Sequence, residues 1–88
     1  MINKRLTVKS PAGLTLLALG KIVRISREQH CSVLFENENG EKANSDSYFE
    51  MLALCAILGT TLQVTVDGLN ETKTLTMIQE VFENGAGI

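Results

Sequence analysis

The sequence contains little of the chemistry on which most metal sites and catalytic sites depend. It has one histidine, His30, and two cysteines, Cys31 and Cys55, whose separation does not match a zinc-ligand spacing. A catalytic pair of His30 and Cys31 is possible on paper, but neighbouring residues of a strand point to opposite faces, which argues against it. We therefore expect His30 to be an ordinary loop residue, both cysteines to be buried thiols, and no metal or other cofactor to be bound.

Long hydrophobic runs are also absent. The longest apolar-rich stretch, residues 14–25, is interrupted by polar residues such as Lys21 and Arg24, and it falls short of the roughly 18 apolar residues of a membrane span. Residues 1–5 do not begin the apolar core of a signal peptide. We therefore expect a cytoplasmic protein that has no membrane partner.

Neither sign of charge dominates the composition. Charged residues make up 20% of the chain, hydrophobic residues make up 44%, and the formal net charge is −2. Because the basic residues are scattered in short clusters, the sequence does not predict a nucleic-acid partner. These values are typical of a globular protein, and 88 residues build a single core, so residues 1–88 are treated as one domain.

Hydrophobic periodicity and turn residues predict the secondary structure. The Asn39-Gly40 pair is a strong hairpin signal, and Asn70 can cap the last helix. The predicted strands are residues 2–8, 31–36, 41–43 and 60–66. The predicted helices are one of about three turns from Leu16, a short one from Ser47 to Leu54, and one that follows Asn70. Residues 84–88 end this last helix and are expected to fray.

The resulting order is β-α-β-β-α-β-α. Strands with one solvated face pair in an antiparallel manner, and the helices must then cover the other face of the sheet. The sequence thus predicts an α/β (α+β) open-faced sandwich, in which three helices cover one face of a four-stranded antiparallel sheet.

Three local features of this arrangement resemble one known family. Residues 11–14 form a Pro-Ala-Gly-Leu turn before the first helix, residues 39–43 form the hairpin that Ser47 follows, and residues 58–68 combine a Leu-Gly-Thr loop, a strand and an Asp-Gly turn. In order and spacing they are similar to HPr, the phosphocarrier of the bacterial sugar phosphotransferase system, over essentially the whole chain. The resemblance implies the HPr fold and protein partners from that system or from its regulation.

The resemblance ends at the phosphorylation motif, which in the HPr family reads Gly-Leu-His-Thr-Arg-Pro-Ala. Residues 13–19 read Gly-Leu-Thr-Leu-Leu-Ala-Leu, so Thr15 stands at the histidine, Leu17 at the arginine and Ala18 at the proline. A threonine phosphate is a far poorer donor than a phosphohistidine, and leucine cannot bind a phosphoryl group as arginine does. We therefore expect Thr15 and Leu17 to form a pseudo-active site, with no catalytic residue and no enzymatic activity.

Ser47 has two interpretations. The resemblance places it where many HPr proteins carry a serine that a dedicated kinase phosphorylates, after which the modified protein binds a transcriptional regulator. Ser47 and Glu50 also match a capping box, in which the serine is the N-cap of the short helix and contributes about 1 kcal/mol. We favour the structural interpretation, because Asp46 opposes a neighbouring phosphate, and keep Ser47 as the candidate regulatory site.

In the HPr family, the start of the first helix and the short helix lie side by side and form the docking surface. Leu16 and Leu17 replace residues that are normally polar there, which predicts an enlarged apolar patch. Phe49 or Leu52 is expected to fill the core. The predicted interaction surface consists of Leu16, Leu17, Tyr48 and Met51.

Three functions agree with these observations. The first is a non-catalytic regulatory or interaction module derived from HPr, the second is a phosphocarrier with an altered acceptor, and the third is a structural homo-oligomer. Thr15 and Leu17 argue against the second function, whereas the apolar patch suits either a foreign protein or a homodimer. We take the first function as the prediction.

Overall fold

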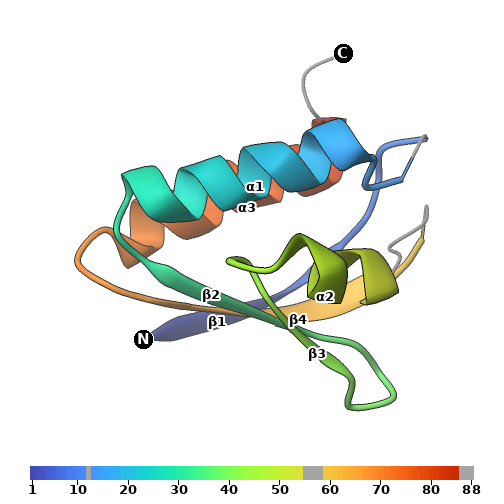
Figure 1. The fold of residues 1–88 in the computed structure, drawn as a ribbon, viewed down its shortest axis with the longest axis horizontal. Coiled ribbons are helices and arrows are strands. Elements are labelled where there is room, and N and C mark those ends of the chain that lie inside the picture. Colours follow the sequence, from blue (N-terminus) through green and yellow to red (C-terminus); the bar gives the residue numbers. More distant parts are fainter. Residues whose placement is uncertain (12, 55–58, 86–88) are drawn as a thin grey trace.

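The computed structural model of the chain describes residues 1–11, 13–54 and 59–85, without the side chains of Tyr48 and Ala53. Its elements follow the predicted order β-α-β-β-α-β-α (Figure 1). They are β1 (Ile2–Thr7), α1 (Leu16–Glu28), β2 (Ser32–Glu36), β3 (Lys42–Asn44), α2 (Tyr48–Leu54), β4 (Thr61–Asp67) and α3 (Glu71–Asn84). Each predicted strand boundary lies within one residue of the observed one.

The four strands form one antiparallel sheet in the order β1-β4-β2-β3. In the centre, β4 pairs Leu62 with Leu6 of β1 and Val64 with Phe35 of β2. Leu62, Val64 and Val66 are buried because every second side chain of β4 points toward the helices, and the side chains between them point to the open side. The sheet is thus covered on one face, which confirms the predicted open-faced sandwich.

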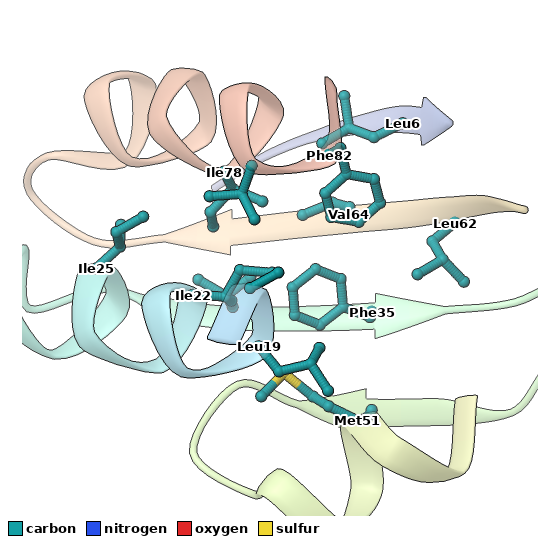
Figure 2. Close-up of a cluster of buried hydrophobic side chains, with 14 of the residues drawn as sticks. Leu6, Leu19, Ile22, Ile25, Phe35, Met51, Leu62, Val64, Ile78 and Phe82 are labelled. Carbon is teal, nitrogen blue, oxygen red and sulfur yellow. The ribbon is translucent and has the colours of Figure 1, made fainter. Parts of the chain in front are cut away.

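The helices α1 and α3 contact each other and lie on the covered face of the sheet (Figure 1). Their buried residues recur at helical spacing, as Leu19 and Ile22 do on α1 and Ile78 and Phe82 do on α3. Figure 2 shows these side chains between the helices and the sheet, where the ring of Phe82 stacks on that of Phe35 with centroids 6.1 Å apart. Full burial of each such side chain stabilises the fold by about 1.5–3 kcal/mol.

Asn37 organises the hairpin between β2 and β3. Its side-chain oxygen accepts the backbone N–H groups of Asn39 and Glu41 at 3.0 and 2.9 Å, and its carbonyl accepts the N–H of Gly40 at 3.1 Å. Gly40 has a φ of 81°, in the left-handed region that favours glycine. The Asn39-Gly40 signal therefore marks the hairpin correctly, but Asn37 supplies the side-chain hydrogen bonds.

The end of α3 is linked by backbone hydrogen bonds to the segment after β1. Asn84 is the last residue of the helix, and the N–H of the buried Gly85 donates to the carbonyl of Val81 at 2.7 Å. The N–H of Lys9, just after β1, donates to the carbonyl of Phe82 at 2.8 Å and so ties the two segments together. Fraying of residues 84–88 stays a prediction, and residues 86–88 lie outside the described part of the chain.

The turn from β4 into α3 is organised by Glu71. Asn70 precedes the helix as predicted, but its side chain makes no capping hydrogen bond. Instead, Oε2 of Glu71 accepts the N–H of Gly68 at 3.4 Å and pairs with the N-terminal ammonium group of Met1 at 2.7 Å. A Cβ on Gly68 would lie 2.7 Å from Sγ of Cys31, so this turn has room only for glycine.

Candidate functional site

Thr15 is the N-cap of α1. Its backbone is extended, with φ −71° and ψ 172°, and its Oγ1 accepts the N–H of Ala18 at 3.3 Å. Its carbonyl accepts the N–H of Leu19 at 2.9 Å. A threonine stabilises a helix start in this way because the first N–H groups have no partner within the helix. Thr15 itself is exposed, so the predicted pseudo-active site lies at the surface.

The two residues after Thr15 leave their side chains in solvent. Leu16 and Leu17 are 64% and 65% exposed, whereas Ala18 is buried. Consecutive helical residues point about 100° apart, so at least one of these two leucines was expected to reach solvent. The first-turn N–H groups can attract an anion, but the side chain of Leu17 offers it no hydrogen-bond donor.

Ser47 is the N-cap of α2, because its Oγ accepts the N–H of Glu50 at 3.2 Å. The carboxylate of Glu50 does not return to Ser47, as a closed capping box requires; its Oε1 accepts the N–H of Asn44 at 2.9 Å. The N–H of Ser47 bonds instead to the carbonyl of Asn44 at 2.9 Å. The capping role of Ser47 is confirmed, and the expected second half of the box is replaced by a link from α2 to β3.

The side of α2 that faces solvent differs from the predicted one. Met51 is 4% exposed and reaches from α2 toward Leu19 in the core (Figure 2), whereas Phe49 and Leu52 are 86% and 41% exposed. The placement of Met51 on the interaction surface, and of Phe49 or Leu52 in the core, is therefore wrong. Residues three apart share one side of a helix, so Met51 and Leu54 pack inward together while Phe49 and Leu52 point away.

The helices α1 and α2 contact each other, and we call their exposed large apolar side chains together the α1–α2 patch. Its members are Leu16, Leu17, Phe49 and Leu52. The side chain of Tyr48, which the sequence also assigned to this surface, lies outside the described part of the chain. Sequence reasoning missed Phe49 and Leu52 because α2 is apolar on nearly every side, so no pattern separates its core residues from its surface residues.

A small apolar cavity lies between α1, α2 and the sheet. Its volume is about 10 Å³, far below that of a ligand pocket, which is roughly 300–1,000 Å³. It is lined by Leu14, Leu19, Ile22, Phe35, Met51, Leu54 and Leu62. This cavity is therefore too small to hold a ligand.

His30 follows the last turn of α1, at the opposite end of the helix from Thr15, and is exposed with a φ of 53°. Cys31 is buried, and its Sγ donates to the carbonyl of Gln29 at 3.4 Å and accepts a hydrogen bond from Thr74 at 3.3 Å. Neither bond involves His30. Cys55 lies outside the described residues.

Residues 1–11, 13–54 and 59–85 contain no cluster of histidine, cysteine, aspartate or glutamate that could hold a metal ion. None of their helices has the length and apolar character needed to cross a membrane.

Comparison with known proteins agrees with this geometry. The family model described as "PTS HPr component phosphorylation site" matches residues 2–84. The chain belongs to the HPr family. Among its HPr relatives is the "Phosphocarrier protein HPr" of Xylella fastidiosa strain Temecula1, which is 32% identical over 85 residues, spanning 96% of this chain and 93% of the relative.

Solved HPr structures share the fold at lower sequence identity. The HPr of Bacillus anthracis strain Ames superposes with a TM-score of 0.80 at 20% identity, covering 90% of this chain and 93% of that one. HPr-C-His from Thermoanaerobacter tengcongensis gives a TM-score of 0.86 at 18% identity, covering 100% and 98%. The HPr fold is therefore retained, although few residues are shared with these proteins.

Proposed function

We propose that this HPr-family chain is a non-catalytic regulatory or interaction module that does not relay phosphohistidine. The observation that carries the proposal is the position of the only histidine in the sequence. His30 lies beyond the C-terminal end of α1, whereas Thr15 precedes its first residue, and a helix of 13 residues separates the two by about 20 Å. No imidazole is therefore available at the helix start, where the HPr motif carries its phosphoacceptor.

The groups at this helix start support the same proposal. An imidazole accepts a phosphoryl group at neutral pH and releases it readily, whereas an alcohol is a weak nucleophile without an adjacent base. The Oγ1 of Thr15 is already engaged with the N–H of Ala18, and Leu17 cannot donate to phosphate. Both the acceptor and the charge partner of a phosphorelay are thus missing.

The α1–α2 patch supports a role in binding proteins. HPr proteins act together with other proteins of the phosphotransferase system, and a member without the relay still presents its surface to such partners or to regulatory proteins. Large apolar side chains that gather on a small monomer usually mark an interface. The patch combines two such residues at the start of α1 with two on α2.

The alternative is a phosphocarrier of the phosphoenolpyruvate-dependent sugar phosphotransferase system that uses an altered acceptor. Two observations favour it: the match to the family model of the phosphorylation site over residues 2–84, and relatives that are named phosphocarriers. Under this alternative, a hydroxyl group such as that of Thr15 or Ser47 would have to receive the phosphoryl group.

Incubation with Enzyme I and phosphoenolpyruvate, followed by intact-mass measurement, separates the two functions. We expect no gain in mass under conditions that fully phosphorylate an HPr with the usual histidine. An acid-labile gain of one phosphoryl group would overturn the proposal. An acid-stable gain that Thr15→Val or Ser47→Ala abolishes would establish the alternative and identify the acceptor.

A further inference from the structure

The strongest surface feature beyond the pseudo-active site is the concentration of apolar side chains on α1 and α2. Six large hydrophobic side chains are exposed within the described ranges, and four of them form the α1–α2 patch. The other two, Met1 and Leu69, belong to the N-terminus and to the turn before α3. Such a concentration often marks an interface, whereas single exposed apolar side chains are ordinary.

The charges around the patch differ between its two helices. Lys21 and Arg24 follow Leu17 by four and seven positions, so they continue the solvent-facing stripe of α1. At the start of α2, Asp46 and Glu50 are exposed, and residues 45–54 contain no lysine or arginine. One helix thus borders the patch with positive charge and the other borders it with negative charge.

We propose that a second copy of this chain docks on the α1–α2 patch, with a twofold axis that runs between α1 and α2. This proposal rests on the proposed function, in which the surface binds a protein instead of relaying phosphate. A twofold interface uses the same surface twice, so that surface must be complementary to itself. The axis places α1 of each protomer on α2 of the other. The leucines of α1 then contact apolar residues of the partner's α2, and Arg24, on the basic stripe of α1, faces the partner's Asp46.

Self-complementarity favours a second copy over a foreign protein. A foreign partner must match an apolar centre, a basic border and an acidic border at once. A second copy carries the same three groups, and a twofold axis places its acidic border against the basic border of the first copy. Four side chains cover less than the roughly 800 Å² per partner of a stable interface. The dimer is therefore weak, with a dissociation constant of about 10 µM to 1 mM.

Sedimentation velocity over a concentration range that brackets these values tests the proposal on the unmodified chain. We expect a reversible shift from monomer to dimer as concentration rises. Leu17→Ser should raise the dissociation constant by about tenfold or more, because the twofold axis removes the leucine from the interface twice. Leu69→Ser is the matched control, since that leucine is 99% exposed but lies away from the patch, and it should leave the dissociation constant unchanged.

A charge exchange tests the relative orientation of the two protomers. Arg24→Glu and Asp46→Lys should each weaken the dimer by about two- to fivefold at low salt, as exposed ion pairs do. The double variant should recover the original affinity, because each swapped charge again faces its opposite across the axis. A double variant weaker than either single variant would overturn this arrangement.

Two further outcomes would overturn the second-copy proposal. One is a monomer at every concentration, including a monomer that binds only a foreign protein. The other is a dimer that Leu17→Ser leaves intact, because it would use another surface. Both results are independent of the Enzyme I assay, so the dimer can fail while the proposed function stands, and the reverse also holds.

Discussion

At the scale of single residues, two serines near the start of α2 have opposite environments. Ser45 is 1% exposed, and within the described part of the chain its Oγ has no hydrogen-bond partner, although its N–H bonds to the carbonyl of Val33. Ser47 lies nearer the surface and caps the helix through its Oγ. The hydroxyl of Ser45 lowers the stability of the fold, because burial removes its hydration and no hydrogen bond replaces it. The hydroxyl of Ser47 raises the stability, because it makes a hydrogen bond.

We predict that Ser45→Ala leaves the free energy of unfolding unchanged or raises it by up to about 1 kcal/mol. The substitution removes an unsatisfied hydroxyl and keeps the backbone bond to Val33. Urea denaturation monitored by circular dichroism measures the change. A loss of more than about 1 kcal/mol would show that the hydroxyl of Ser45 does have a partner, such as a buried water.

Ser47→Ala should have the opposite effect and lower the free energy of unfolding by about 0.5–2 kcal/mol, because the N–H of Glu50 loses its side-chain acceptor. The same urea experiment measures it, and Ser47→Thr, which keeps a hydroxyl, is the control. If Ser47 is regulatory instead, a cognate HPr kinase should label the unmodified chain and not the alanine variant. Unchanged stability together with lost labelling would contradict the structural role that we favour.

Gly68→Ala should destabilise the domain by about 1–3 kcal/mol, because a Cβ there lies 2.7 Å from Sγ of Cys31 and 2.9 Å from the carbonyl oxygen of His30. The residues next to these two contacts are paired in the sheet, Asp67 of β4 with Ser32 of β2, which opposes a movement of either segment. The same substitution in a Cys31→Ala background should cost less, since the nearest contact is gone. Equal costs in the two backgrounds would mean that the backbone contact alone decides the effect.

At the scale of elements, most of the fold could be predicted from sequence, whereas the orientation of α2 could not. Strands such as β4 and helices such as α3 have one buried face each, so their periodicity reports both their type and their orientation. The seven residues of α2 are almost all apolar, so its sequence predicts a helix without indicating which side is buried. Packing against the core selects Met51, and that choice depends on residues distant in sequence.

The candidate site could be predicted to a similar extent. The N-cap Ser47 was predicted because a capping side chain acts within three residues of itself, whereas the cap that Thr15 forms on α1 was not predicted from the sequence. Exposure of Leu16 and Leu17 followed from helix geometry, since Leu19 and Ile22 already occupied the buried side. The exposure of Phe49 and the half-open capping box at Glu50 depend on contacts between elements, and therefore required the structure.

The pair between Met1 and Glu71 links the start of β1 to the first turn of α3 and predicts a pH dependence. A hydrogen bond with Glu71 raises the pKa of the N-terminal amine above its ordinary value of 8.0, and the same bond, with the N–H of Gly68, lowers the pKa of Glu71 below 4.5. The carboxylate therefore favours folding above pH 4.5 and loses this effect as pH falls through its lowered pKa. The amine favours folding below pH 8.0 and loses the effect as pH rises through its raised pKa.

The measurement is an NMR titration of the Glu71 side chain. Because both groups are exposed, the shift in pKa is a clearer signal than a change in stability. We expect the pKa of Glu71 to rise toward its ordinary value when the N-terminal amine is acetylated. An unchanged pKa of Glu71 would mean that the ion pair does not persist in solution.

At the scale of the whole molecule, the fold and the phosphorelay are physically separable. The core lies between the covered face of the sheet and the three helices, whereas Thr15 and Leu17 are exposed at the end of one helix. Substitution of these two residues therefore changes the surface chemistry with little effect on the buried contacts. Under the proposed function, this separation explains how a chain can keep the HPr fold and its family membership without relaying phosphate.

The same separation predicts how phosphate transfer could be restored. Thr15→His alone should accept little phosphate from Enzyme I, because the imidazole has no charge partner at Leu17. The double variant Thr15→His and Leu17→Arg should gain an acid-labile phosphoryl group, since arginine donates two hydrogen bonds to phosphate oxygens. Loss of the Thr15 cap costs about 1 kcal/mol, which a folded domain tolerates.

Intact-mass analysis measures the gain, and Thr15→Ala with Leu17→Arg is the control without an imidazole. If the folded double variant stays unlabelled, two side chains do not account for the missing relay, and Ala18, which replaces the proline of the HPr motif, is the next position to restore.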